Sequence, residues 1–225
     1  MSLYHGPPLP AGSIRLLRLL LCPDQDSHIE CTLFPYHLLE SETTHLFEAI
    51  SYVWGSRDKL QCIRVNGFEC EVEENLHALL LCLRDRLIER VIWVDAICIN
   101  QKDPTEKGYQ VQSMAKIYAK ASRVIVWLGV ATATSKQALD HIRRAGRQRA
   151  ATEVSTQATE QATERGAQAS EQAVINLLEQ PWFQRIWVYI AGRDGKRSRV
   201  LLRKSARFFK RLLPLDIFLS CVAPR

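Results

Sequence analysis

Hydrophobic and polar positions recur along the chain with two different periods. Short runs rich in apolar and β-branched residues predict strands over residues 14–21, 29–34, 47–54, 91–94 and 123–129. Two further runs, 62–65 and 68–72, flank Asn66-Gly67. That dipeptide tolerates the positive φ angles of a type I′ turn, so the sequence predicts a β-hairpin here.

Two segments have the period of an amphipathic helix. The first follows the hairpin, with an apolar stripe at Leu76, Leu79, Leu80, Leu83 and Leu87. The second covers Thr105–Ala121, with one face formed by Val111, Met114, Ile117, Tyr118 and Ala121. The strand predicted over residues 91–94, this helix and the strand predicted over residues 123–129 have the pattern of a βαβ unit. The crossover of such a unit is expected to be right-handed. The pattern therefore predicts an α/β fold with a parallel sheet.

Composition divides the 225 residues into three parts. Residues 1–13 are rich in Pro and Gly and predict an irregular lead-in. Residues 14–190 form the predicted domain, interrupted at 131–173 by a low-complexity insertion that is either an exposed helix or disordered, because it has few large apolar residues. Residues 191–225 form a basic tail.

The positive charge belongs to that tail. The whole chain has a formal net charge of +6, but residues 193–225 hold ten Lys and Arg against two Asp, a net +8. The remainder has a net charge of −2, so specific nucleic-acid binding is not expected. We expect a cytoplasmic protein, because the N-terminus lacks a signal-peptide pattern and no apolar run is long enough to span a membrane.

The seven cysteines contain no C-x-x-C pair, so no zinc site is predicted. Most of them are expected to be buried thiols in a reducing compartment. Cys98 would need a neighbouring base to act as a nucleophile, and no His is spaced to provide one, so a structural role is favoured.

Polar residues gather where two predicted strands end. One cluster is Ser51, Tyr52, Trp54 and Gly55, and the other is Asp95, Asn100 and Gln101. Ligands bind beyond the carboxyl ends of strands in open α/β sheets, which makes these residues candidates for a binding site. Glu106 opens the following helix, where free N–H groups would favour a phosphate.

Each candidate also has a structural interpretation. Trp93 and Trp127 lie within apolar runs and are expected in the core, whereas Trp54, beside Gly55, is the better candidate for stacking on a ligand. Asp95 and Asn100 suit hydrogen bonds that hold a loop, and Glu106 suits the positive end of a helix dipole.

Several blocks of this sequence, in order, resemble the heterokaryon incompatibility (HET) family of filamentous fungi. They are Ile14–Leu17, Phe47–Gly55, Ile92–Gln101, Glu106, Gln110–Val111, Met114, Ile117–Tyr118, Val126–Gly129 and Pro181–Trp187. The resemblance implies a fold similar to the Toll/interleukin-1 receptor (TIR) domain, of the flavodoxin type. It implies a role in non-self recognition that leads to programmed cell death.

The resemblance leaves two functions open. One is a signalling module that acts by self-association or through protein partners. The other is an NAD glycohydrolase, since TIR relatives include enzymes that cleave NAD with a glutamate after a Trp; NAD or a related nucleotide would then be the ligand. The family motif Trp-x-x-Gln-Glu has Ile190 and Ala191 at its last two positions here. We therefore assign no catalytic residue and favour the signalling module.

The tail departs from the family pattern after Trp187. A truncated or wrongly spliced coding sequence would explain the departure. Alternatively, the basic and apolar residues of Leu201–Leu213 form an amphipathic helix that binds an anionic membrane surface.

Overall fold

The computed structural model describes residues 3–4, 8–22, 27–39, 45–140, 144, 172–177, 179–184, 189–191 and 197–199. The chain divides into two compact units, one built mainly on residues 1–129 and the other beginning at Val130. Most of the low-complexity segment and the predicted tail helix over Leu201–Leu213 lie outside the described residues.

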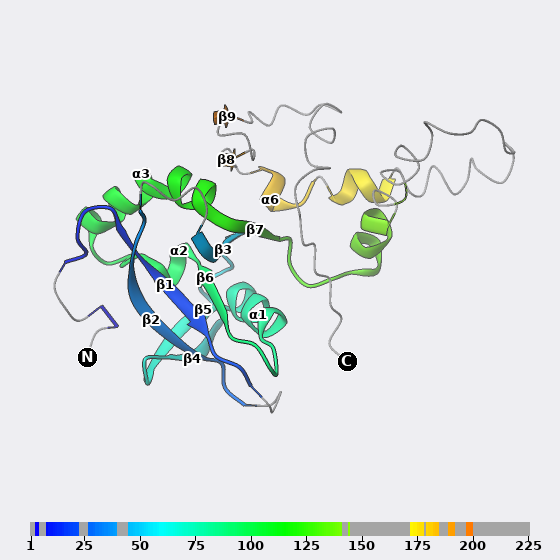
Figure 1. Ribbon diagram of the computed structural model, residues 1–225. Helices are drawn as coiled ribbons and strands as arrows, with labels where there is room; N and C mark the ends of the chain where they lie inside the picture. The colour runs from blue at the N-terminus through cyan, green and yellow to red at the C-terminus, as the bar shows by residue number, and fades with distance from the viewer. Residues whose placement is uncertain are drawn as a thin grey trace, which may run out of the picture. The chain divides into compact units, whose positions relative to one another are not determined.

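The first unit contains a seven-stranded sheet (Figure 1). Its spatial order is β5-β4-β2-β1-β6-β3-β7. The strands are β1 (Ser13–Leu19), β2 (Glu30–His37), β3 (His45–Tyr52), β4 (Leu60–Val65), β5 (Phe68–Glu73), β6 (Arg90–Trp93) and β7 (Ala121–Trp127). The α/β class predicted from the sequence is therefore present.

The sheet is mixed, so the prediction of a parallel sheet is correct for only part of it. Strand β3 is parallel to both β6 and β7, and β2 is parallel to β4. Strand β1 is antiparallel to β2 and to β6, and β4 is antiparallel to β5. The predicted βαβ unit exists as β6, α3 and β7, but β3 lies between its two strands.

The predicted hairpin is confirmed. Val65 and Phe68 are paired at the end of β4 and β5. The two residues between them both have positive φ, 52° for Asn66 and 79° for Gly67, which is the backbone requirement of a type I′ turn. The Asn66 side chain also exchanges two hydrogen bonds with the backbone of Leu33, at 2.9 and 3.1 Å. The turn is thereby tied to β2.

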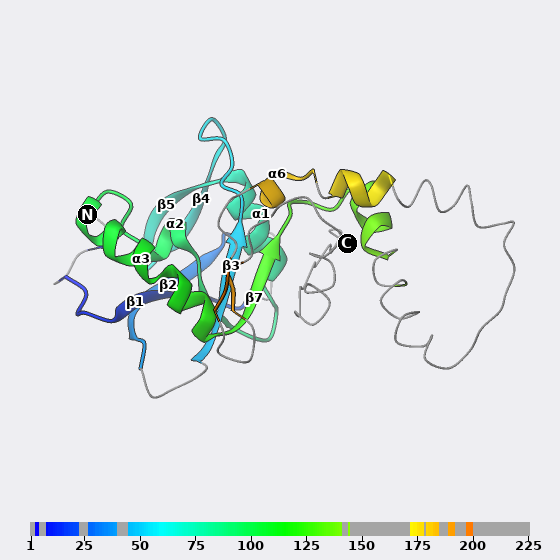
Figure 2. The same ribbon diagram turned by 90° about the horizontal axis from the view of Figure 1, so that it is seen from above.

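Two helices cover opposite faces of the parallel strands (Figure 2). Helix α1 (Glu74–Leu83) covers the face of the sheet from which the Trp127 side chain projects. Helix α3 (Pro104–Lys120) covers the face from which the Trp93 side chain projects. The leucine stripe is correct up to Leu83, but Leu87 lies beyond the helix and is 84% exposed. The predicted apolar face of α3 is wrong at Val111, which is 51% exposed.

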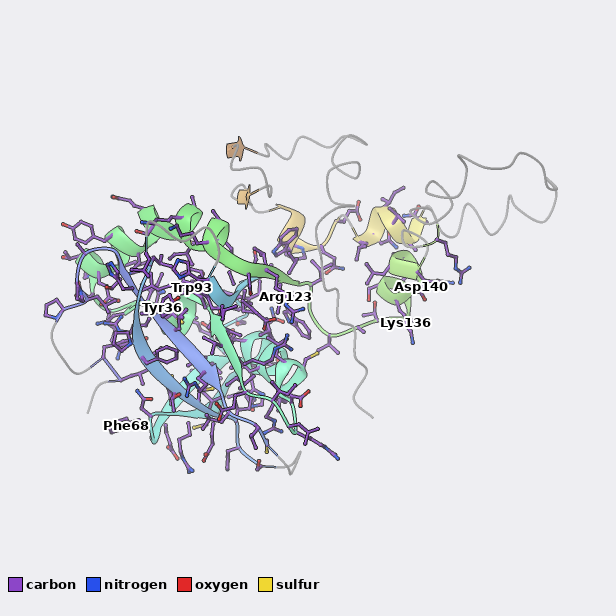
Figure 3. All side chains as sticks on the ribbon, in the orientation of Figure 1. Tyr36, Phe68, Trp93, Arg123, Lys136 and Asp140 are labelled. Carbon is purple, nitrogen blue, oxygen red and sulfur yellow. The ribbon has the colours of Figure 1, made fainter. Side chains whose placement is uncertain are left out.

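The core is apolar and continuous through this unit. Trp93 is fully buried, and Trp127 is 8% exposed, as the sequence predicts. Trp93, labelled in Figure 3, lies within this core. Its ring packs edge-on against that of Tyr118 of α3, with ring centroids 5.6 Å apart. Of the six free cysteines among the described residues, Cys31 and Cys98 are buried. The prediction that most cysteines are buried is therefore wrong for the described part of the chain.

The remaining described elements are short. In the second unit, residues 133–140 and 172–177 and α6 (Pro181–Gln184) are helical, and Trp182 is buried. Strands β8 (Tyr189–Ala191) and β9 (Arg197–Arg199) form a separate antiparallel pair. No helix within the described ranges has the length and apolar character needed to cross a membrane.

Candidate functional site

The two polar loops predicted from the sequence meet in the structure. Trp54 follows β3, and Asp95 follows β6, the neighbouring parallel strand. The indole Nε1–H of Trp54 donates to both carboxylate oxygens of Asp95, at 3.1 and 3.2 Å. A hydrogen bond to a charged acceptor is stronger than one between neutral groups. The bond therefore fixes the edge of the Trp54 ring against the second loop.

Asp95 also begins α2 (Asp95–Cys98), a single turn that redirects the chain after β6. The side-chain Nε2 of Gln101 donates to the Asp95 backbone carbonyl at 2.8 Å. Its other amide atom, Oε1, is buried and has no hydrogen-bond partner among the described residues. A buried acceptor of this kind has unused capacity for a donor. Trp54, Asp95 and Gln101 thus form one connected group.

Asn100 and Glu106 are connected to this group through the backbone of the loop. The Glu106 carboxylate accepts from the Asn100 backbone N–H at 2.8 Å, and it pairs with Arg15 of β1, Nη2 to Oε2 at 3.0 Å. The Asn100 side chain accepts from the backbone N–H of Lys102 at 3.2 Å. The charged side chains of Arg15 and Glu106 are largely buried, at 12% and 14% exposed. Glu106 therefore holds the loop in place through contacts within the chain.

The N-terminus of α3 does not offer the free N–H groups that were expected to favour phosphate. Asp103 caps the helix, and its side chain accepts from the backbone N–H groups of Thr105 and Glu106, at 2.9 and 3.1 Å. Asp and Asn side chains fill this role at many helix starts. The cap adds a negative charge where an anion would have to bind, so the expectation is wrong.

The remaining predicted residues lie on or just after β3. The Tyr52 side chain is 2% exposed and belongs to the core, and its strand neighbour Ser51 is partly exposed. Gly55 lies against the start of α1: a Cβ added there would be 3.4 Å from the Glu73 Cβ and 3.5 Å from the Asn75 Cβ. These residues place the Trp54 loop at the end of β3 and against the start of α1.

The sequence did not single out Asn75, which joins the ends of two strands. Its Nδ2 donates to the Val53 carbonyl at 2.6 Å, and its Oδ1 accepts from the Trp127 indole at 2.8 Å. The partners lie 22 and 52 residues away in the sequence. No local pattern could have indicated either bond.

Cys98 lies beside Asp95 but is unsuited to nucleophilic chemistry. Burial, opposed in part by a hydrogen bond from the Val94 backbone N–H, raises the pKa of the Cys98 thiol to about 12. The reactive form of cysteine is the thiolate, so burial keeps Cys98 in its unreactive thiol form near neutral pH. The structure thus agrees with a structural role. Among the described residues, no group of three or more His, Cys, Asp and Glu could hold a metal ion.

The fold and the joined loops define an α/β domain with a polar cluster beyond the ends of its parallel strands. The sequence model of the family described as heterokaryon incompatibility protein (HET) matches residues 47–190, which include both loops. The chain belongs to the HET family.

One curated relative is the heterokaryon incompatibility protein 6, OR allele, of Neurospora crassa. It is 30% identical to this chain over 152 residues, which cover 62% of this chain and 22% of the relative. The match therefore spans about a fifth of the relative's length. Comparison with the solved structures gave no significant match.

Proposed function

We propose that this chain is a signalling module of fungal non-self recognition, which triggers programmed cell death when incompatible cells fuse. Membership of the HET family and the name of the Neurospora relative support this role. The observation on which the proposed site depends is the Trp54–Asp95 hydrogen bond. It joins two loops that both lie within residues 47–190, the region that the HET family model matches. The module acts in the cytoplasm, through self-association or contact with protein partners.

The likeness to TIR domains forms a further part of the proposal. Three neighbouring parallel strands, β6, β3 and β7, with helices on both faces, support it. In such an arrangement the loops after the strands are the surface on which partners or ligands bind. Trp54 is the residue that we expect a partner to contact, since its ring is partly exposed while its N–H is already bonded.

Conditional expression in a filamentous fungus tests this function. Expression of the full chain is expected to stop growth and admit a vital dye, whereas W54A and D95A are expected to lose most of that effect. K107A is the matched control, because Lys107 is an exposed residue of α3. Survival of cells that express the wild-type chain would contradict the proposal, and full killing by both W54A and D95A would exclude this site from it.

The second candidate function is cleavage of NAD. One observation favours it: the Asp95 carboxylate lies against the Trp54 indole at the strand ends, and the buried Oε1 of Gln101 is an acceptor that has no hydrogen-bond partner among the described residues. Ile190 and Ala191, where the family has Gln and Glu, lie in β8. Nicotinamide release by the purified chain, compared with the double variant I190Q/A191E, distinguishes the candidates. We expect no release by the wild-type chain, and turnover by it would make the enzyme the better interpretation.

A further inference from the structure

The side-chain amide of Asn75 connects three separate parts of the first unit. Asn75 is the second residue of α1. Its Nδ2 donor bonds the carbonyl of Val53, the residue after β3 ends at Tyr52, at 2.6 Å. Its Oδ1 acceptor bonds the indole of Trp127, the last residue of β7, at 2.8 Å. A primary amide is suited to this position because it carries a donor and an acceptor side by side.

The loop that carries Trp54 rests on the same residue. Val53 precedes Trp54, and its carbonyl accepts a hydrogen bond from Asn75. Gly55 follows Trp54 and packs closely against Asn75: a Cβ added to Gly55 would lie 3.5 Å from the Asn75 Cβ. Both neighbours of Trp54 are thus held against the start of α1. A side chain whose backbone is fixed on both sides loses little further entropy when it makes a hydrogen bond.

We infer that Asn75 is the positioning residue of this site, holding residues 53–55 so that the Trp54 indole reaches Asp95. The inference concerns the site named in the proposed function and rests on it for its importance. Asn75 acts through the loop, because its side-chain amide bonds the Val53 carbonyl directly before Trp54. The chain of contacts runs from Trp127 through Asn75 and the Val53 carbonyl to Trp54, and then to Asp95.

The indole N–H signals of the five tryptophans provide the readout. The chain is labelled with ¹⁵N-tryptophan, and W54F and W127F assign the two signals. N75D keeps an acceptor for Trp127 but loses the donor to Val53. N75A loses both. E74Q, at the adjacent exposed position, is the matched control.

We expect the Trp54 N–H to exchange with solvent at least about tenfold faster in both Asn75 variants, because the loop that orients it is released. The Trp127 signal is expected to move in N75A and to stay in N75D. The signal of Trp93, which is fully buried, is expected to stay in every variant. A purely structural role for Asn75 would move all three signals together.

Two results would overturn the inference. One is a Trp54 signal that keeps its position and exchange rate in N75D, and the other is a Trp93 signal that moves as much as that of Trp54. If N75A does not fold, N75D decides alone, since a carboxylate is favourable near a helix N-terminus. A displaced Trp54 in a variant that still kills fungal cells would confirm the positioning role and count against the proposed function of the site.

Discussion

The two halves of the sheet use polar side chains differently. In the parallel half, β6, β3 and β7, the Glu48 carboxylate accepts from Arg90 at 2.9 and 3.0 Å and also from Arg123. These residues are 42 and 75 positions apart from Glu48, and Glu48 is 13% exposed. In the other half, β5, β4, β2 and β1, the Arg64–Glu30 pair joins β4 to β2 at 2.9 Å, and both of its side chains are about half exposed.

The difference shows where each half obtains its order. A local turn determines the pairing of β4 with β5. The hairpin therefore needs no buried ion pair, and its charged side chains can stay exposed to solvent. Strands β6, β3 and β7 come from distant parts of the chain, and partly buried polar contacts join them at both ends: Glu48 with its two arginines, and Asn75 with Trp127 and Val53. The candidate site lies in the half that is fixed by these long-range contacts.

The largest effect is expected from Glu48. E48Q leaves two neighbouring guanidinium groups without their shared carboxylate, and we expect a loss of about 3 kcal/mol in the free energy of unfolding. Arg123 is 34% exposed, so the loss falls at the lower end for buried pairs. The matched control is E30Q in the other half of the sheet, which removes the exposed Arg64–Glu30 pair and for which we expect a loss of less than about 1 kcal/mol. Urea unfolding measures both, and equal losses would remove the distinction between the halves.

A smaller effect is expected at the hairpin turn. Gly67 has a φ of 79°, and a Cβ added there would meet no atom within 4 Å. G67A therefore tests backbone conformation alone, and we expect it to cost about 1 kcal/mol. Gly108 is also uncrowded but lies within α3, so G108A is expected to stabilise the protein by up to about 1 kcal/mol. A neutral G67A would show that the local turn does not set this half.

The smallest effect concerns His77 of α1, the helix that reaches both halves. Burial, and then the charge of Arg84, lower the pKa of His77 below its ordinary value of 6.5. The unfolded chain then binds a proton that the folded chain does not, so stability falls as the pH drops below about 6.5. We expect the urea midpoint to fall less in H77Q than in the wild-type chain between about pH 7.5 and about pH 5.5. An identical fall in both would contradict this assignment.

The sequence predicted those parts of the fold that have local causes. Asn66-Gly67 indicated the hairpin because the two residues themselves adopt the required φ angles. The strand order was not predictable, because the insertion of β3 between β6 and β7 leaves no local pattern. The antiparallel pairing of β1 with β6 was missed for the same reason.

The candidate site shows the same division. The polar residues after β3 and β6 were found because polar positions follow apolar runs there. The sequence indicated that the two loops could form one site, but it did not indicate the hydrogen bond between Trp54 and Asp95. It also did not indicate that Arg15, 91 positions away, pairs with Glu106. Asn75 was missed because its importance depends entirely on Val53 and Trp127.

The central claim is that the loops after β3 and β6 are joined through Trp54 and Asp95, and a double-mutant cycle tests it most directly. The free energy of unfolding is measured for the wild-type chain, W54F, D95A and the double variant, with W54F combined with E30Q as the distant control. We predict a coupling of about 1.5 kcal/mol between Trp54 and Asp95, as for a hydrogen bond to a charged group. Losses that add to within about 0.3 kcal/mol, as expected for the control pair, would contradict the claim.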